Sequence, residues 1–174
     1  MAFTENVSPL EYMQIVPGFA PEALTTARVA TPVSLKNYRR CVVVFNKGIG
    51  TAGDDPTITL LQGTDMAFGT NKALNFSEIF VKQDPTTLNH VGQRTRVTKP
   101  VDNNTYTDLT SAEQQAVWEI AIKADDLDVE NGYTCIRAQL GDVGTNPQIG
   151  SIFYILLDPL FAGRPEDLPS ALVD

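Results

Sequence analysis

Residues 113–157 decide the fold. They run Glu113-Gln-Gln-Ala-Val-Trp-Glu-Ile-Ala-Ile-Lys123, then Asp125-Asp-Leu-Asp-Val-Glu-Asn-Gly132, Tyr133-Thr-Cys-Ile-Arg-Ala-Gln-Leu140 and, after a glycine-rich loop, Ser151-Ile-Phe-Tyr-Ile-Leu-Leu157. In the first run, Trp118, Ile120 and Ile122 alternate with more polar neighbours, which is typical of a half-buried strand. Asn131-Gly132 predicts a tight hairpin corner. The whole stretch therefore predicts a three-stranded β-meander, with 151–157 as a central strand.

Further strands are predicted upstream of this region. Residues 33–46 are expected to form one long strand, and its segment Val42-Val-Val-Phe45 favours burial on both faces. A glycine-rich loop and residues 57–62 follow, so we expect a hairpin with a long loop. Residues 73–82 and 93–99 are also expected to be extended. The pattern predicts an all-β fold, an antiparallel β-sandwich, and a jelly roll is one topology that it allows.

The two ends of the chain differ from the predicted sandwich at 33–157. Four prolines interrupt residues 1–32, and three occur in residues 158–174. Both segments carry large apolar side chains, which solvated tails lack, so both are interpreted as arms that dock on something. For the first segment, an edge segment packed on its own domain is an equal alternative, and Ser8 with Pro9 predicts a helical turn there. The residues predicted to bind a partner are Leu10, Tyr12, Met13, Ile15, Val16, Phe19, Leu160, Phe161 and Leu168.

Composition limits the choice of partners and compartments. The 174 residues include 13 Lys and Arg against 21 Asp and Glu, a net charge of −8. This balance argues against nucleic acid and against an anionic membrane surface as partners. No signal peptide or membrane span is recognisable, so we expect synthesis and folding in the cytoplasm of the host cell. Cys41 and Cys135 lie in apolar strand patterns and are expected to be buried free thiols.

No motif supports an enzyme or a cofactor. Gly48-Ile-Gly50-Thr-Ala-Gly53 has the spacing of a dinucleotide-binding loop, but Asp54-Asp-Pro56 and a strand follow where a helix is required. We expect these glycines to serve a loop with positive φ. His90 is the single histidine and lies in a polar stretch without a nucleophile motif, so neither a zinc site nor a catalytic triad is expected.

Two binding alternatives remain open at this stage. The acidic turn at 125–130 departs from the spacing of an EF-hand, and it is interpreted as a solvated turn with a looser calcium site as the alternative. Trp118, Tyr133 and Tyr154 are the aromatic residues from which a sugar-binding platform could be built. The apolar face of its strand favours a core position for Trp118.

Several stretches resemble small structural proteins of tailed bacteriophages. They are Lys47-Gly-Ile-Gly-Thr-Ala-Gly-Asp-Asp-Pro-Thr-Ile-Thr-Leu60, Lys72-Ala-Leu-Asn-Phe76, Ser111-Ala-Glu-Gln-Gln-Ala-Val-Trp118, Lys123-Ala-Asp-Asp-Leu-Asp-Val-Glu-Asn-Gly-Tyr133 and Gly141-Asp-Val-Gly-Thr-Asn-Pro-Gln-Ile-Gly150. The resemblance covers about residues 40–157 and implies a virion component, a head decoration (cement) protein. Such a protein would be non-enzymatic, would sit on the capsid surface as a dimer or trimer, and would bind the major capsid protein. A tail or neck protein and a carbohydrate-binding module are the alternatives.

Overall fold

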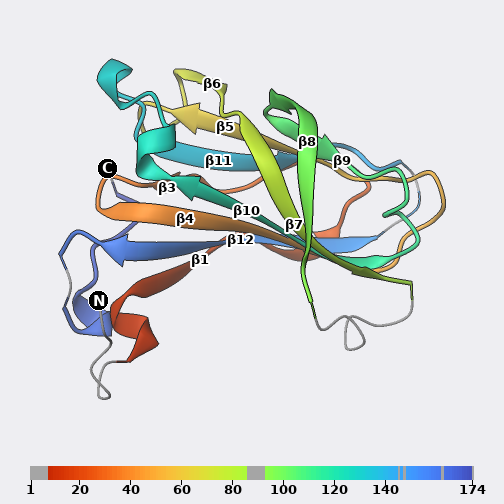
Figure 1. Ribbon diagram of the computed structural model, residues 1–174, viewed down its shortest axis with the longest axis horizontal. Coiled ribbons are helices and arrows are strands. Elements are labelled where there is room, and N and C mark those ends of the chain that lie inside the picture. Colours follow the sequence, from red (N-terminus) through yellow and green to blue (C-terminus); the bar gives the residue numbers. More distant parts are fainter. Residues whose placement is uncertain (1–7, 86–92, 145, 147, 162, 174) are drawn as a thin grey trace.

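The computed structural model describes residues 8–85, 93–144, 146, 148–161 and 163–173, which form two antiparallel β-sheets packed face to face (Figure 1). The predicted all-β sandwich is confirmed. In this part of the chain, helical structure is limited to short 3-10 turns such as η1 (Pro9–Glu11). No helix among the described residues has the length and apolarity that a membrane span requires.

Each sheet combines strands that are distant in sequence. Sheet A has the order β1 (Met13–Ala23), β12 (Ile149–Pro159), β4 (Tyr38–Lys47), β10 (Gln115–Lys123), β7 (Phe76–Asp84) and β8 (Thr95–Asn103). Sheet B has the order β2 (Arg28–Val29), β11 (Cys135–Leu140), β5 (Thr57–Gly63) and β6 (Asn71–Ala73), while β3 (Val33–Ser34) also pairs with β11 and β9 (Thr105–Thr107) with β5.

The core lies between the sheets and is centred on Trp118, as its strand pattern predicts. Trp118 is fully buried and meets the Phe45 ring edge-on at 5.3 Å between centroids. It meets the Tyr106 ring of sheet B in the same way at 4.9 Å. Edge-to-face contacts of this kind are favoured by the ring quadrupoles. The Trp118 side chain therefore joins the two sheets.

The predicted meander and hairpin are wrong. β10 and β12 lie in sheet A, whereas β11 lies in sheet B, and β4 and β5 are likewise in different sheets. Alternation along a strand indicates which face is buried, but it does not select the neighbouring strand. Gly132 does have a positive φ of 82°, but it ends a 3-10 turn instead of forming a hairpin corner.

The predicted strand at 33–46 is interrupted. Its first two residues form β3 in sheet B, and β4 begins at Tyr38 in sheet A. Between them the chain turns, and the Tyr38 amide donates a 3.1 Å hydrogen bond to the Leu35 carbonyl. A continuous apolar pattern spans this turn because Val33, Leu35 and Tyr38 are all buried in the same core.

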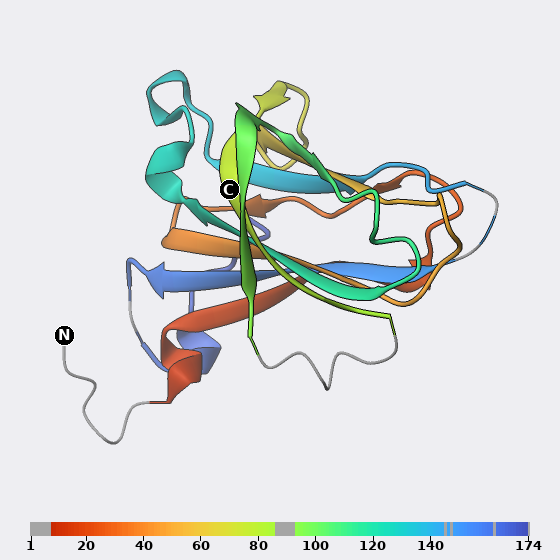
Figure 2. The same cartoon turned by 45° about the vertical axis from the view of Figure 1, so that its right-hand side comes forward.

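Both ends of the chain pack on their own domain. β1 pairs with β12 over Met13–Ala23, so this part of the predicted arm is an edge strand, the second of the two interpretations. Beyond β12, the Pro169 carbonyl accepts a 2.6 Å hydrogen bond from the Tyr38 hydroxyl. The Ala171 carbonyl accepts a 2.8 Å bond from the Ser34 amide, and Ala171 itself is buried. Figure 2 shows η1 and the segment after β12 at the same end of the sandwich.

We expect Trp118→Ala to lower the free energy of unfolding by about 3–5 kcal/mol, because it opens a cavity between the sheets. The same change leaves the Gln83 Oε1 atom without the donor that the indole now supplies at 2.9 Å. Urea unfolding followed by far-UV circular dichroism measures the loss. Leu109→Ala, at an exposed turn, is the matched control and should change stability by less than about 0.5 kcal/mol.

Candidate interaction surface

The two ends of the chain meet at one end of sheet A. The Asp158 amide donates a 3.1 Å hydrogen bond to the Tyr12 carbonyl, and the Leu160 amide donates a 2.9 Å bond to the Asn37 carbonyl. These bonds hold the entry to β1 beside the exit from β12. We refer to the exposed apolar side chains of the two segments together as the terminal surface: Leu10 (55% exposed), Ile15 (56%), Leu160 (47%) and Phe161 (72%).

The other predicted partner-binding residues are less accessible. Val16 is 5% exposed and belongs to the core, because it is on the inward-facing side of β1. Phe19 is half-buried and packs against the core. Tyr12, Met13 and Leu168 are also half-buried. The structure thus brings four of the nine residues to an open surface and places Val16 inside.

A cationic hollow of about 380 Å³ adjoins the terminal surface. Leu160 and Asp158 line it together with residues from β4 and from the end of β10. The basic side chains in this lining are Lys36, Arg39, Arg40 and Lys123. The antiparallel register places Lys123 opposite Arg40, which explains how a sequence-distant lysine joins the group.

One ion pair fixes the shape of this hollow. Arg40 is ion-paired with Asp158, and this contact raises the pKa of the guanidinium. Asp158 has a φ of 56°, a left-handed conformation that Asp tolerates better than most residues. The pair therefore orients the chain where it leaves β12. The sequence did not lead us to predict this hollow. The feature that could have indicated it is the basic pair Arg39-Arg40, which precedes an apolar strand.

Lys47, the last residue of β4, directs its buried ammonium group at the segment before β10. The side chain is 2% exposed, and Nζ donates hydrogen bonds to the carbonyls of Ser111 (2.6 Å) and Gln114 (2.7 Å). Burial lowers the pKa of Lys47 to about 8, although Asp55 and Asp108 act in the opposite direction. With its protons directed at backbone carbonyls, Lys47 anchors a turn.

The glycine-rich loop that follows β4 is hydrogen-bonded to the same segment, before β10, that holds Lys47. Gly53 has a φ of 87°, as expected for a loop, and β5 follows where a nucleotide site would need a helix. An Asp55 carboxylate oxygen accepts a 2.8 Å hydrogen bond from the Ala112 amide. The Asp54 carbonyl accepts a bond from the buried Gln148 side chain. These carboxyl and carbonyl groups fasten neighbouring loops to each other.

The acidic turn and the other side chains considered as metal ligands are not brought together in one site. Asp128 of the acidic turn is ion-paired with Lys72 and accepts two hydrogen bonds from Asn131. Within the described ranges, no three His, Cys, Asp or Glu side chains are placed to hold a metal ion. His90 lies outside the described residues.

The aromatic and thiol groups are in the interior. Trp118 and Tyr154 are fully buried, so they cannot form the sugar-binding platform considered from the sequence. The Tyr154 hydroxyl accepts a 3.0 Å hydrogen bond from the Ala138 amide, and burial raises the pKa of this tyrosine. Cys41 and Cys135 are buried free thiols, as predicted, and they belong to opposite sheets.

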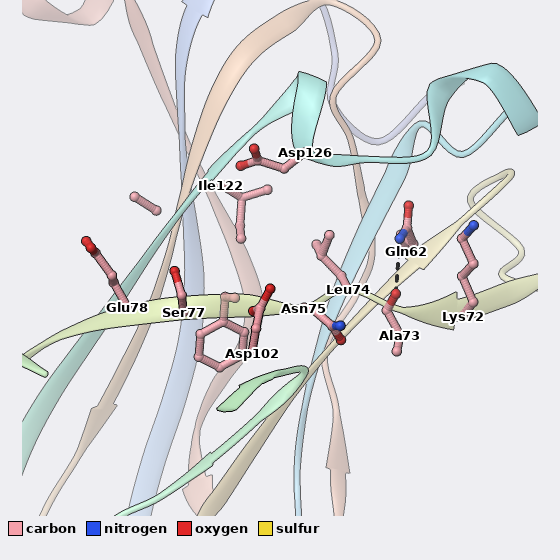
Figure 3. Close-up of a pocket in the computed structure, with 12 residues that line it drawn as sticks. Gln62, Lys72, Ala73, Leu74, Asn75, Ser77, Glu78, Asp102, Ile122 and Asp126 are labelled. Atoms are coloured by element: carbon pink, nitrogen blue, oxygen red, sulfur yellow. Dashed lines mark hydrogen bonds between the residues drawn. The ribbon is translucent and has the colours of Figure 1, made fainter. Parts of the chain in front are cut away.

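A larger cleft, of about 660 Å³, lies beside β6 and the first residues of β7 (Figure 3). Its lining is mainly polar, and several of the polar groups already have protein partners. Glu78 is ion-paired with Arg96, and the Gln62 amide donates to the Ala73 carbonyl at 3.0 Å. Asp126 accepts a 2.8 Å bond from the Lys123 amide. The cleft thus presents groups that stabilise the surrounding loops.

The structure is that of an all-β sandwich in which the start of β1 and the end of β12 lie side by side and both segments expose apolar side chains. No protein-family model matches the chain, and no curated protein matches it. Among solved structures, the chain is similar to the SPBc2 prophage-derived protein YomS, with a TM-score of 0.46 and 11% sequence identity. That match covers 84% of this chain and 93% of the YomS chain.

Between pH 8 and the onset of tyrosine ionisation near pH 10, we expect the free energy of unfolding to rise by about 1 kcal/mol relative to that of Lys47→Met, a reference that cancels the opposite effect of the buried Cys41 thiol, whose pKa burial raises. Below pH 8, Lys47 is protonated in both states, and the cost of burying its charge is fully present. Above the folded-state pKa of about 8, the folded protein loses this proton, while the unfolded chain keeps it up to about 10.5. Urea unfolding at a series of pH values measures the rise.

Lys47→Met is the matched variant for this measurement. It removes the titrating group and leaves the carbonyls of Ser111 and Gln114 without their donor, so we expect about 1–3 kcal/mol lower stability at pH 7. Its stability should not rise between pH 8 and pH 10. An equal rise in the variant would show that another group is responsible.

Proposed function

We propose that the protein is a non-enzymatic structural component of a phage particle that binds the major capsid protein as a decoration protein. The observation that carries this proposal is the exposure of large apolar side chains on two neighbouring segments, one before and within β1 and one after β12. The resemblance of residues 40–157 to small structural proteins of tailed phages supports the same class. The partner-binding role falls to Leu10, Ile15, Leu160 and Phe161.

The terminal surface has the chemistry of a protein-binding site. Phe161 and Leu160 each offer about 1.5–3 kcal/mol on full burial, the range for large apolar side chains. Interfaces commonly place such apolar anchors beside charged groups that set orientation and partner choice. Here the neighbouring charges are those of the hollow, where four cations, including Arg39 and Lys36, outnumber the two carboxylates of Asp125 and Asp158. The partner surface is therefore expected to offer an apolar pocket bordered by carboxylates.

The segments that present these anchors are held in place before binding. Antiparallel pairing with β12 fixes β1, and hydrogen bonds at Pro169 and Ala171 fix the segment that follows Phe161. Ordering a flexible segment on binding costs free energy, and a segment that is already ordered avoids that cost. Attachment through the terminal surface would consequently resemble the docking of a rigid module.

We expect Phe161→Asp and Leu10→Asp to reduce occupancy of phage heads at least tenfold, because each places a carboxylate where an apolar pocket would receive a hydrophobic group. Heads that lack the protein are mixed with purified variants, sedimented and quantified for bound chain. Leu109→Asp is the matched control, since Leu109 is 82% exposed on a turn between β9 and β10.

Two outcomes would contradict the proposal. Full occupancy by both terminal-surface variants would exclude the terminal surface as the binding site. Copy number in purified particles tests the position, because hundreds of copies indicate the shell, whereas about six or twelve indicate the tail or neck. Unchanged melting temperatures of the variants confirm that the measured loss is one of binding.

A further inference from the structure

The cationic hollow beside the terminal surface continues into a second hollow of about 220 Å³. The two hollows share four lining residues: Leu35, Lys36, Ala124 and Asp125. The other residues that line the second hollow are Leu127, Val129, Tyr133 and Thr134. We call the two hollows together the end groove, because they lie at the end of the sandwich where β4 begins and where β10 and β12 end.

The end groove passes from sheet A to sheet B. Its first part lies at the ends of β12, β4 and β10. Its second part lies against the turns η3 (Ala124–Asp126) and η4 (Val129–Asn131), which lead to β11. Figures 1 and 2 show these turns at the end of the sandwich where β12 ends. The groove is therefore longer than either hollow alone, as the binding of an extended chain requires.

Apolar side chains form the floor of the end groove and also stand at its two ends. Leu35 and Leu127 are only 3% and 6% exposed, so they form the floor. Val129 is 54% exposed and lines only the second hollow, whereas Leu160 is 47% exposed and lines only the first. Because the burial of such side chains is favourable, an occupant with apolar side chains gains free energy at both ends of the groove.

Positive charge distinguishes the end groove from the rest of this acidic chain. The lining contains four cations and two carboxylates, whereas the whole chain has a net charge of −8. Arg40 and Asp158 neutralise each other in an ion pair. Arg39 and Lys123 are exposed and have no ion-pair partner among the residues that the structure describes, and Asp125 is the second carboxylate of the lining. Attraction therefore outweighs repulsion for an acidic segment in this groove.

Hydrogen bonds hold the walls of the end groove in place. The Leu35 amide donates a 2.8 Å bond to the Thr134 carbonyl, which joins the wall before β4 to the wall before β11. The Asp128 amide, between η3 and η4, donates a 2.8 Å bond to the Gln62 side chain of β5. Because these walls are ordered without an occupant, binding costs little conformational entropy on the side of this chain.

We propose that the end groove binds an extended acidic segment of the partner protein, in which carboxylates are interspersed with large apolar side chains. The carboxylates would lie against Arg39 and Lys123, and the apolar side chains against Leu160 and Val129. This inference rests on the proposed function, because it assigns the segment to the protein that docks on the terminal surface. It adds a second element to that partner, namely a chain that lies in the groove.

Fluorescence anisotropy with the purified chain tests the groove directly. The probe is a short labelled peptide in which leucine alternates with glutamate, and peptides with lysine or glutamine in place of glutamate are its controls. We expect saturable binding of the glutamate peptide and at least about tenfold weaker binding of both controls. Binding of the glutamate peptide should also weaken between about 0.05 M and about 0.5 M salt, because salt screens the attraction of exposed charges.

Arg39→Glu and Lys123→Glu should each weaken binding of the glutamate peptide at least about fivefold, because each turns an attraction into a repulsion. Val129→Asp should weaken it by a similar factor, because it places a carboxylate at the apolar end of the groove. All three side chains are exposed, so the variants retain the fold, which unchanged melting temperatures verify. Lys82→Glu is the matched control, since it makes the same change of charge on β7 and Lys82 lines neither hollow.

Three results would overturn the inference. They are the absence of saturable binding up to about 1 mM peptide, equal binding of the lysine peptide, and a loss in Lys82→Glu as large as that in the groove variants.

Occupancy of phage heads separates this inference from the proposed function. If Phe161→Asp lowers occupancy but Arg39→Glu and Lys123→Glu do not, the groove inference fails and the proposed attachment stands. If the glutamate peptide binds as expected but none of these variants changes occupancy, the proposed attachment fails and the groove stands as a site for acidic segments.

Discussion

The contact that the rest of the structure depends on is the packing of Trp118 between the two sheets. Its ring meets Phe45 within sheet A and Tyr106 across the sandwich, so one side chain fixes how the sheets face each other. A buried indole also needs an acceptor for its N–H group, and the Gln83 side chain supplies it at 2.9 Å. The position of Trp118 therefore sets the position of a polar group as well as the core.

From Gln83, a chain of hydrogen bonds leads to the loops at one end of the sandwich. The Gln83 amide donates to the Asp108 carboxylate at 2.9 Å, and Asp108 accepts two bonds from Thr110. Burial raises the pKa of Asp108, but these hydrogen bonds outweigh it and lower the pKa overall. The turn that follows supplies the carbonyls that hold Lys47. These polar contacts order the loops at that end, while the terminal surface lies where β1 begins and β12 ends.

The sequence predicted the strands and the core better than their arrangement. Alternation identified the β10 strand and the burial of Trp118, because the side-chain period depends on local backbone geometry alone. The partners of each strand depend on contacts between distant residues, so the order of sheet A could not be predicted. The cationic hollow was missed for the same reason, since Lys123 reaches Arg40 only through strand pairing. The composition of the two ends indicated apolar side chains that need cover, but it could not decide, for residues 1–32, between an arm and an edge segment packed on its own domain, which is what β1 is.

Both edges of sheet A carry features that hinder pairing with a further strand. Pro17 and Pro21 lie in β1, and the β1–β12 register shifts twice between Pro17 and Glu22. Proline removes a ladder donor and bulges bend a strand, and both hinder the addition of a strand at an edge. On the opposite edge, β8 contains Lys99 and Pro100, which hinder strand addition in the same way. Both edges are therefore protected against edge-to-edge pairing, so a partner that binds sheet A has to do so through side chains. A contact made through side chains depends on complementary shape and charge, so it selects its partner more strictly than backbone pairing does.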